Sequence, residues 1–179
     1  MSRDFTVAPL DRWTLLGLWL PMTSAMAIAA GSVLWSSSEQ VPRGLLFTLP
    51  FVLLVGVALH LLLRRRRIQL EHGELKVTAT MFQKRVPVNA IDLDKARIID
   101  LDEHTEFKPR VKTNGFSLPA FTAGHYRLRN KAKAFCLISD CSRVLVLPLR
   151  EGPLVLLSPE KPRELLDGLR EVAASAPRR

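Results

Sequence analysis

The chain has 179 residues, a formal net charge of +9 and only two cysteines, and 47% of its residues are hydrophobic. This length suits one compact domain beside any membrane segment, and the charge fits a partner such as an anionic membrane surface. The aromatic and glycine-rich signatures of RNA-binding modules are missing, so we expect no nucleic-acid partner.

Two apolar runs, Trp13–Trp35 and Leu45–Leu63, contain no Asp, Glu, Lys or Arg. A helix needs about 20 apolar residues to cross a bilayer, so each run predicts one membrane-spanning helix. The short polar stretch between them predicts an antiparallel hairpin. A cleaved signal peptide is the alternative for the first run, but its length and the acidic flank, Asp4 and Asp11, disfavour it. Residues 1–67 are therefore assigned to a tail and a two-helix anchor that contacts membrane lipids.

The second run ends in four consecutive arginines: Arg64, Arg65, Arg66 and Arg67. Arg43 is the only Lys or Arg in the stretch between the runs, whereas two further arginines, Arg3 and Arg12, precede the first run. The positive-inside rule therefore predicts that both termini lie in the cytoplasm. The four arginines are expected to face anionic headgroups. We interpret His60 as an interfacial residue rather than a proton or ligand site, because it lies one turn before them.

From Ile68 the apolar residues begin to alternate. Residues 68–71 and 75–78, separated by His72-Gly73, predict a hairpin of two strands. Further strands are predicted over residues 84–88, 96–101, 126–128, 135–138, 144–147 and 154–157. Residues 102–117 predict a long loop, because they are polar and contain Pro109 and Asn114-Gly115.

The last predicted element is an amphipathic helix that begins at Pro162. Its apolar face consists of Leu165, Leu166, Leu169 and Val172. About seven strands followed by such a helix form an α+β pattern, a bent antiparallel sheet capped by a C-terminal helix. We assign residues 68–175 to this cytoplasmic domain and residues 176–179 to a tail.

Three segments carry a resemblance to a known group: Asn-Gly-Phe-Ser-Leu-Pro at 114–119, Gly-His-Tyr-Arg at 124–127 and Leu-Ser-Pro-Glu-Lys-Pro at 157–162. Together with the helix hairpin, they resemble bacterial membrane proteins that carry a pleckstrin-homology-like (PH-like) domain. The resemblance implies a PH-like barrel, a binding module rather than an enzyme, and the inner membrane of a bacterium. The chain departs from the group at Ala120, where glycine is common, and at Lys161, where an acidic residue is common.

The sequence contains none of the common catalytic motifs, so we expect no catalytic residue and no cofactor. The acidic group at residues 100–106, which surrounds His104, lacks the ordered ligand spacing of a calcium loop, and we expect no metal. Cys136 and Cys141 lack the Cys-x-x-Cys spacing of redox or zinc sites. Cys136 is expected to be buried, and Cys141 to lie in a turn.

The candidate binding residues fall into a basic group and an apolar group. The basic residues are Lys108, Arg110 and Lys112 in the predicted loop, and Arg127 and Arg129, followed by Lys131 and Lys133, around a predicted turn. Alternation places such side chains on one face of an extended backbone, which could bind an acidic partner or anionic headgroups, or be an ordinary solvated face. The apolar residues Phe116, Leu118 and Phe121 could make contacts in a binding loop or be core residues that hold the loop.

The leading hypothesis is a non-enzymatic, multi-pass inner-membrane protein whose PH-like domain binds or scaffolds a protein partner, or self-associates, at the membrane. One alternative is an accessory subunit of a transporter or channel, in which the hairpin would be the working part. Its few polar residues argue against a conduction path of its own. Another alternative is a module that binds anionic lipids.

Overall fold

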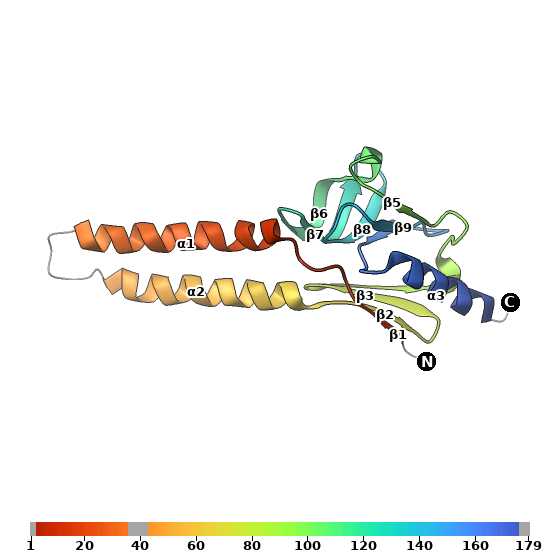
Figure 1. Ribbon diagram of the computed structural model, residues 1–179, viewed down its shortest axis with the longest axis horizontal. Helices are drawn as coiled ribbons and strands as arrows, with labels where there is room; N and C mark the ends of the chain where they lie inside the picture. The colour runs from red at the N-terminus through yellow and green to blue at the C-terminus, as the bar shows by residue number, and fades with distance from the viewer. Residues whose placement is uncertain (1–2, 36–42, 176–179) are drawn as a thin grey trace.

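A computed structural model describes residues 3–35 and 43–175. Helices α1 (Arg12–Trp35) and α2 (Arg43–Arg64) lie side by side and antiparallel, and the strands and the last helix form a domain at one end of this pair (Figure 1). The helices have 24 and 22 residues, or about 36 and 33 Å at 1.5 Å per residue. Both are long and apolar enough to cross a membrane. Most of the predicted loop between them lies outside the described residues.

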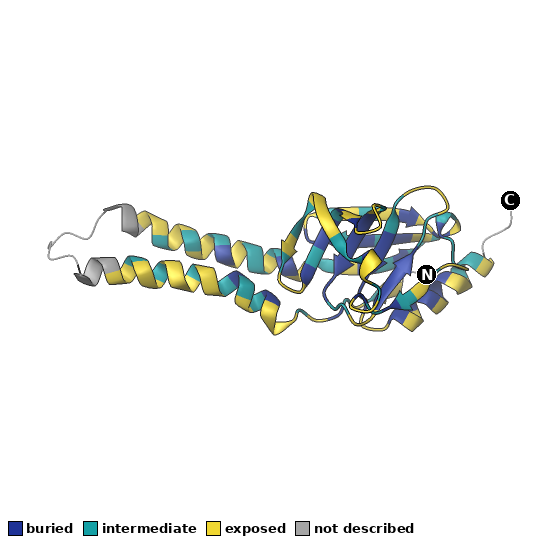
Figure 2. Ribbon diagram, turned by 90° about the horizontal axis from the view of Figure 1, so that it is seen from above, coloured by how far each residue is buried: buried dark blue, intermediate teal, exposed yellow. Residues whose placement is uncertain are grey.

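The helix pair packs along a narrow seam and leaves most of its apolar surface uncovered. Gly56 of α2 lies against Trp19 and Met22 of α1, where a Cβ atom would stand only 2.6 Å from the Met22 sulfur. By contrast, Ile28 is 73% exposed and Leu54 is 66% exposed. Figure 2 shows exposed and half-buried residues along both helices. Such a large apolar surface is typical of a membrane contact.

The first sheet has four antiparallel strands in the order β1-β2-β3-β4. Their bounds are β1 Arg3–Phe5, β2 Arg66–Glu71, β3 Glu74–Ala79 and β4 Phe82–Pro87. Ile68 and Val77 lie directly opposite each other and are fully buried. The turn residues His72 and Gly73 have φ angles of 50° and 79°, as a two-residue hairpin turn requires. The predicted hairpin is confirmed.

The second sheet has six strands in the order β5-β9-β10-β8-β7-β6. Their bounds are β5 Arg97–Ile99, β6 Pro109–Leu118, β7 Phe121–Leu128, β8 Lys133–Ile138, β9 Val144–Leu147 and β10 Leu154–Leu157. All neighbours are antiparallel except β8 and β10, which are parallel. Two short 3-10 helices, η1 (Val88–Ala90) and η2 (Thr105–Phe107), lie in the connections.

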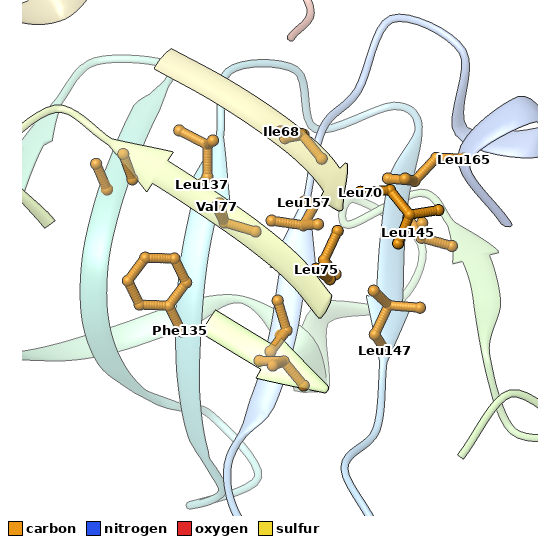
Figure 3. Packing of buried hydrophobic residues seen from close by; sticks show 14 of the residues in the cluster. Ile68, Leu70, Leu75, Val77, Phe135, Leu137, Leu145, Leu147, Leu157 and Leu165 are labelled. Atoms are coloured by element: carbon orange, nitrogen blue, oxygen red, sulfur yellow. The ribbon is translucent and has the colours of Figure 1, made fainter. Parts of the chain in front are cut away.

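The core lies on both faces of the second sheet. On one face, side chains such as Phe135, Leu137 and Leu157 meet Ile68 and Val77 of the first sheet (Figure 3). On the other face, a second cluster includes Ile99, Leu101 and Phe107, which belong to the segment leading from β5 to η2. Because both faces are covered, β8, β9 and β10 are apolar almost throughout rather than alternating.

The C-terminal helix α3 (Pro162–Ser175) begins at the predicted proline and covers the first sheet. Its buried residues include Leu165, Leu166 and Leu169, as the predicted apolar face requires. Gly168 lies against Phe5 and Leu70, where a Cβ atom would stand 3.3 Å from the Phe5 ring. Strands β1 and β2 therefore pack closely under this helix.

The predicted fold class, a helix hairpin followed by a PH-like domain with a C-terminal helix, is confirmed. The strands outnumber the predicted seven, divide into two sheets and include one parallel pair. The loop predicted over residues 102–117 is wrong from Pro109 onward, since Pro109–Leu118 forms β6. This strand lies at the edge of the sheet and bonds only to β7, so a proline at its first position is tolerated.

The predicted N-terminal tail is also wrong, because Arg3–Phe5 within it forms a strand of the domain. In β1, Arg3 lies opposite Leu70 and Phe5 lies opposite Ile68. The three residues of β1 show no alternation of apolar and polar side chains, so their sequence alone does not predict a strand. They are held by pairing with a strand that follows them by more than 60 residues.

Candidate functional site

The segment between β1 and α1 ties the N-terminus to the second sheet. The Ala8 amide donates to the Ser158 carbonyl at 3.0 Å, and the Glu160 amide donates to the Thr6 carbonyl at 2.9 Å. The Ser139 hydroxyl donates to the Ala8 carbonyl at 2.9 Å. Since β1 belongs to the first sheet, this segment joins the two sheets immediately before the chain enters α1.

A second connection holds the domain on the helices, through the turn between β6 and β7. The Thr14 hydroxyl of α1 donates to the Pro119 carbonyl at 2.8 Å. A Cβ atom on Gly17 would stand 2.8 Å from two carbons of the Pro119 ring, so the ring lies directly on this glycine. Leu18 and Leu63 are buried in the main core cluster of the domain. The helix ends and the domain therefore share one core.

The four arginines at the end of α2 occupy two different environments. Arg64, Arg65 and Arg67 are exposed, whereas Arg66 is half-buried. The Arg66 guanidinium donates to the Ala8 carbonyl at 3.1 Å and lies 5.9 Å from the centre of the Phe121 ring. Burial lowers its pKa from the ordinary value. Arg66 thus contacts the domain at the junction with the helices, whereas its three exposed neighbours are free to contact solvent or headgroups.

A hollow of about 370 Å³ lies at this junction. It is lined by Asp4, Phe5, Thr6, Val7, Arg64, Arg66, Arg67 and Ile68. Three guanidinium groups outnumber the one carboxylate, and Asp4 also accepts a hydrogen bond from the Gln69 amide at 2.9 Å. The Nε atom of Arg66 is buried without a partner among the described residues. This chemistry suits an anion such as a phosphate.

The predicted basic residues are brought to one end of the second sheet, and one of them is ion-paired there. Lys108 forms an ion pair with Asp102 at 2.6 Å, so its charge is neutralised locally. Arg110 and Lys112 are exposed on the edge strand β6. Arg127 of β7 is exposed and lies directly opposite Lys133 of β8. Arg127 and Lys133 therefore share one face of the sheet, whereas Lys112, opposite Tyr126, lies on the other face.

We call six exposed residues the distal basic cluster: Arg110, Lys112, Arg127, Arg129, Lys131 and Lys133. Within residues 3–35 and 43–175, none of the six forms an ion pair. Strand β7 runs from Phe121, beside the turn that contacts α1, to Leu128, beside the cluster. At about 3.3 Å per residue, the seven steps from Phe121 to Leu128 separate the two ends by about 23 Å.

The apolar candidates belong to the core rather than to a free loop. Phe121 is 1% exposed, and half-buried Phe116 and Leu118 pack against the main core cluster. The rings of Phe116 and Phe121 are 6.4 Å apart. The segment expected to be a binding loop is thus the β6–β7 hairpin with its turn on α1. Gly124 has a φ of 112°, and a Cβ atom there would stand 2.6 Å from the Asn114 carbonyl oxygen, so the hairpin needs glycine at this position.

The sequence profile of a family described as bacterial PH domain matches residues 66–173. The chain belongs to the bacterial PH domain family. No match was found among curated proteins or among solved structures. The matched range begins with β2 and ends within α3, so the helix pair and β1 lie outside it.

PH-like domains are generally non-catalytic modules. In this bacterial PH domain, the described residues contain no group of three or more His, Cys, Asp or Glu side chains placed to hold a metal ion. Burial raises the pKa of the Cys136 thiol, and burial together with nearby Asp102 raises the pKa of the Cys141 thiol. A raised pKa favours the unreactive thiol over the nucleophilic thiolate.

The residues that connect the bacterial PH domain to its helices could not be found from sequence spacing. Thr14 and Gly17 contact Pro119, which lies more than 100 residues away in the chain. Arg3 forms an ion pair with Glu171 of α3 at 2.6 Å. Gly17, a small residue among bulky apolar neighbours, could have indicated a close contact at this position. In a membrane helix, however, such a residue more often marks helix–helix packing.

Proposed function

We propose that this bacterial PH domain protein is a non-enzymatic, integral protein of the bacterial inner membrane. Its two helices span the bilayer with both termini in the cytoplasm, following the arginine distribution. Its PH-like domain binds an acidic protein partner at the membrane surface. The fixed attachment of the domain, through the Thr6–Ala8 segment and the Pro119 turn, gives that partner a defined orientation relative to the bilayer.

The observation that carries this proposal is the unpaired charge of the distal basic cluster. Arg127 and Lys133 lie directly opposite each other on neighbouring strands, an arrangement that destabilises a sheet when the charges are alike. By contrast, Lys95 pairs with Asp92 and Lys161 pairs with Glu164. An acidic surface placed over the cluster would offset its repulsion and provide charge-assisted hydrogen bonds.

The position of the distal basic cluster favours a protein over the headgroups of the same membrane. The cluster lies about 23 Å along β7 from the turn that contacts α1. Interactions between exposed charges fall off over about 8 Å at physiological ionic strength. Arg64, Arg65 and Arg67, at the end of α2, are better placed for headgroups.

The test is site-specific photo-crosslinking of the full chain in native membranes. A photoreactive residue replaces Arg127, and the same replacement at Arg163, an exposed residue of α3, is the control. We expect a discrete protein adduct from position 127 that Lys133→Glu removes without changing the melting temperature. Absence of an adduct at 127, or equal adducts at both positions, would contradict the proposal.

A second candidate function, binding of anionic lipid headgroups, is favoured by the hollow beside Arg64 and Arg67. It predicts that the purified full chain retains phosphatidylglycerol, and that Arg64→Gln with Arg67→Gln reduces the retained amount several-fold. Arg163→Gln is the matched control. Equal retention by all three proteins would rule out this second function.

A further inference from the structure

The turn between β3 and β4 presents one large apolar side chain outward. Met81 is 68% exposed, whereas the preceding residue, Thr80, is buried. Thr80 has a φ of 59°, and its hydroxyl donates to the Ala79 carbonyl at 2.6 Å. The turn is therefore fixed by Thr80, and its geometry directs Met81 away from the domain.

This turn lies at the level where α2 ends. The Thr80 amide donates to the carbonyl of Arg65, the first residue after the helix, at 2.9 Å. Arg66 lies directly opposite Ala79, so β2 starts beside the residue at which β3 ends. Figure 1 shows the helix-proximal end of β3 beside the end of α2.

The end of α2 coincides with the edge of its apolar run. The run Leu45–Leu63 is about 28 Å long as a helix, close to the roughly 30 Å thickness of bilayer hydrocarbon. Arg65 follows Leu63 by two residues, or about 3 Å along the helix axis. In a membrane spanned by α2, the Thr80–Met81 turn would therefore lie beside the hydrocarbon boundary.

The other sheet approaches the same level through an independent contact. Its β6–β7 turn packs against Thr14 and Gly17, near the start of the apolar run of α1. Leu18, the sixth residue of the first run, and Leu63, the last of the second, are buried in the core shared with the domain. The helix-proximal end of the domain is therefore held near the level of the lipid headgroups on both sides of the helix pair.

We propose that the Thr80–Met81 turn enters the interfacial layer of this bilayer, with Met81 among the headgroups and upper acyl chains. This inference rests on the membrane anchoring proposed above. Met81 is a flexible apolar side chain that fits an irregular environment, and exposed Arg64 and Arg65 beside it can contact phosphate groups. The opposite end of the same sheet differs: the turn at His72 and Gly73 lies between Glu71 and Glu74. The domain would thus touch the membrane through its own turn as well as through its helices.

Fluorescence of a single labelled cysteine in the full chain tests this proposal. The parent protein carries Cys141→Ser and keeps Cys136, which is fully buried. Three variants add Met81→Cys, His72→Cys or Leu54→Cys, each labelled with the environment-sensitive dye NBD. The proteins are reconstituted in vesicles of phosphatidylethanolamine and phosphatidylglycerol. Quenching is measured with aqueous iodide and with lipids that carry a nitroxide near the headgroup.

We expect the label at position 81 to show blue-shifted emission, several-fold weaker iodide quenching than at position 72, and strong quenching by the shallow nitroxide. If position 81 behaves like position 72 while position 54 is blue-shifted, the inserted turn is excluded and the anchoring stands. If position 54 is also quenched by iodide like position 72, both the anchoring and the inserted turn are excluded.

Discussion

Gly17 shows how a single residue can set the position of the domain. It allows the Pro119 ring to lie directly on α1, beside the hydrogen bond from Thr14. The helix offers no other glycine at that level, and any side chain would overlap the proline ring. This contact helps to hold the domain on the helix pair.

Replacing Gly17 with leucine should therefore displace the β6–β7 turn. Overpacking a filled site costs about 1–3 kcal/mol, so we expect a lower melting temperature of the full chain in detergent and faster hydrogen exchange at Phe121 and Thr122. Gly31→Leu is the control, because no atom lies within 4 Å of a Cβ at that position. Equal behaviour of the two variants would show that the Gly17 contact does not hold the turn.

The ion pair between Arg3 and Glu171 links β1 to α3 and gives a pH dependence. A hydrogen bond and the positive charge from Arg3 lower the pKa of the Glu171 carboxyl below its ordinary value of 4.5. The pairing is therefore fully present above the ordinary pKa and is lost as the pH falls through the lowered one. NMR titration of the Glu171 side chain should show a midpoint below 4.5 that Arg3→Gln shifts upward. An unchanged midpoint would exclude the pairing.

Among the elements, those with a local pattern were predictable and those held by distant pairing were not. The β2–β3 hairpin follows from alternation around His72-Gly73, and α3 follows from its proline and its leucines. Strand β6 was missed because Pro109, Asn114-Gly115 and its charges are typical of loops. Strand β1 was missed because only its partner β2 makes it a strand.

In the candidate site, too, residues with a local sequence pattern were predictable and contacts between distant parts of the chain were not. The arginines at the end of α2 form a continuous run and could be placed from sequence. The burial of Arg66 could not be predicted from sequence, because it depends on Ala8 and Phe121, which come from distant parts of the chain. The basic residues around Asn130 were each predicted from sequence as candidate binding residues. That Arg127 faces Lys133 follows from strand register, which a single sequence does not reveal.

The contribution of β1 can be tested with a fragment. Residues 66–175 alone would leave the edge of β2 unpaired and remove the bonds to Ser158 and Glu160. Exposed strand edges promote association, so we expect a lower melting temperature and concentration-dependent oligomers. Residues 3–11 joined ahead of residue 66 by a flexible linker should raise the melting temperature and reduce the oligomers. If both fragments behave alike, β1 is dispensable for the domain.

At the scale of the whole molecule, the N-terminal strand fixes the topology. Because β1 precedes α1 and pairs with β2 after α2, the chain must leave the domain and return to it on the same side of any membrane that the helices cross. In the proposed topology both termini share one compartment with the domain, and the arginine distribution favours the cytoplasm for that compartment.

Thiol accessibility in bacterial spheroplasts tests this central claim most directly. In the Cys141→Ser background, single cysteines replace Glu39, in the loop predicted between the helices, and His72, in the β2–β3 turn. A membrane-impermeant maleimide should label position 39 in intact spheroplasts and position 72 only after permeabilisation. Labelling of position 72 in intact spheroplasts, or protection of position 39, would contradict a hairpin anchor with a cytoplasmic domain.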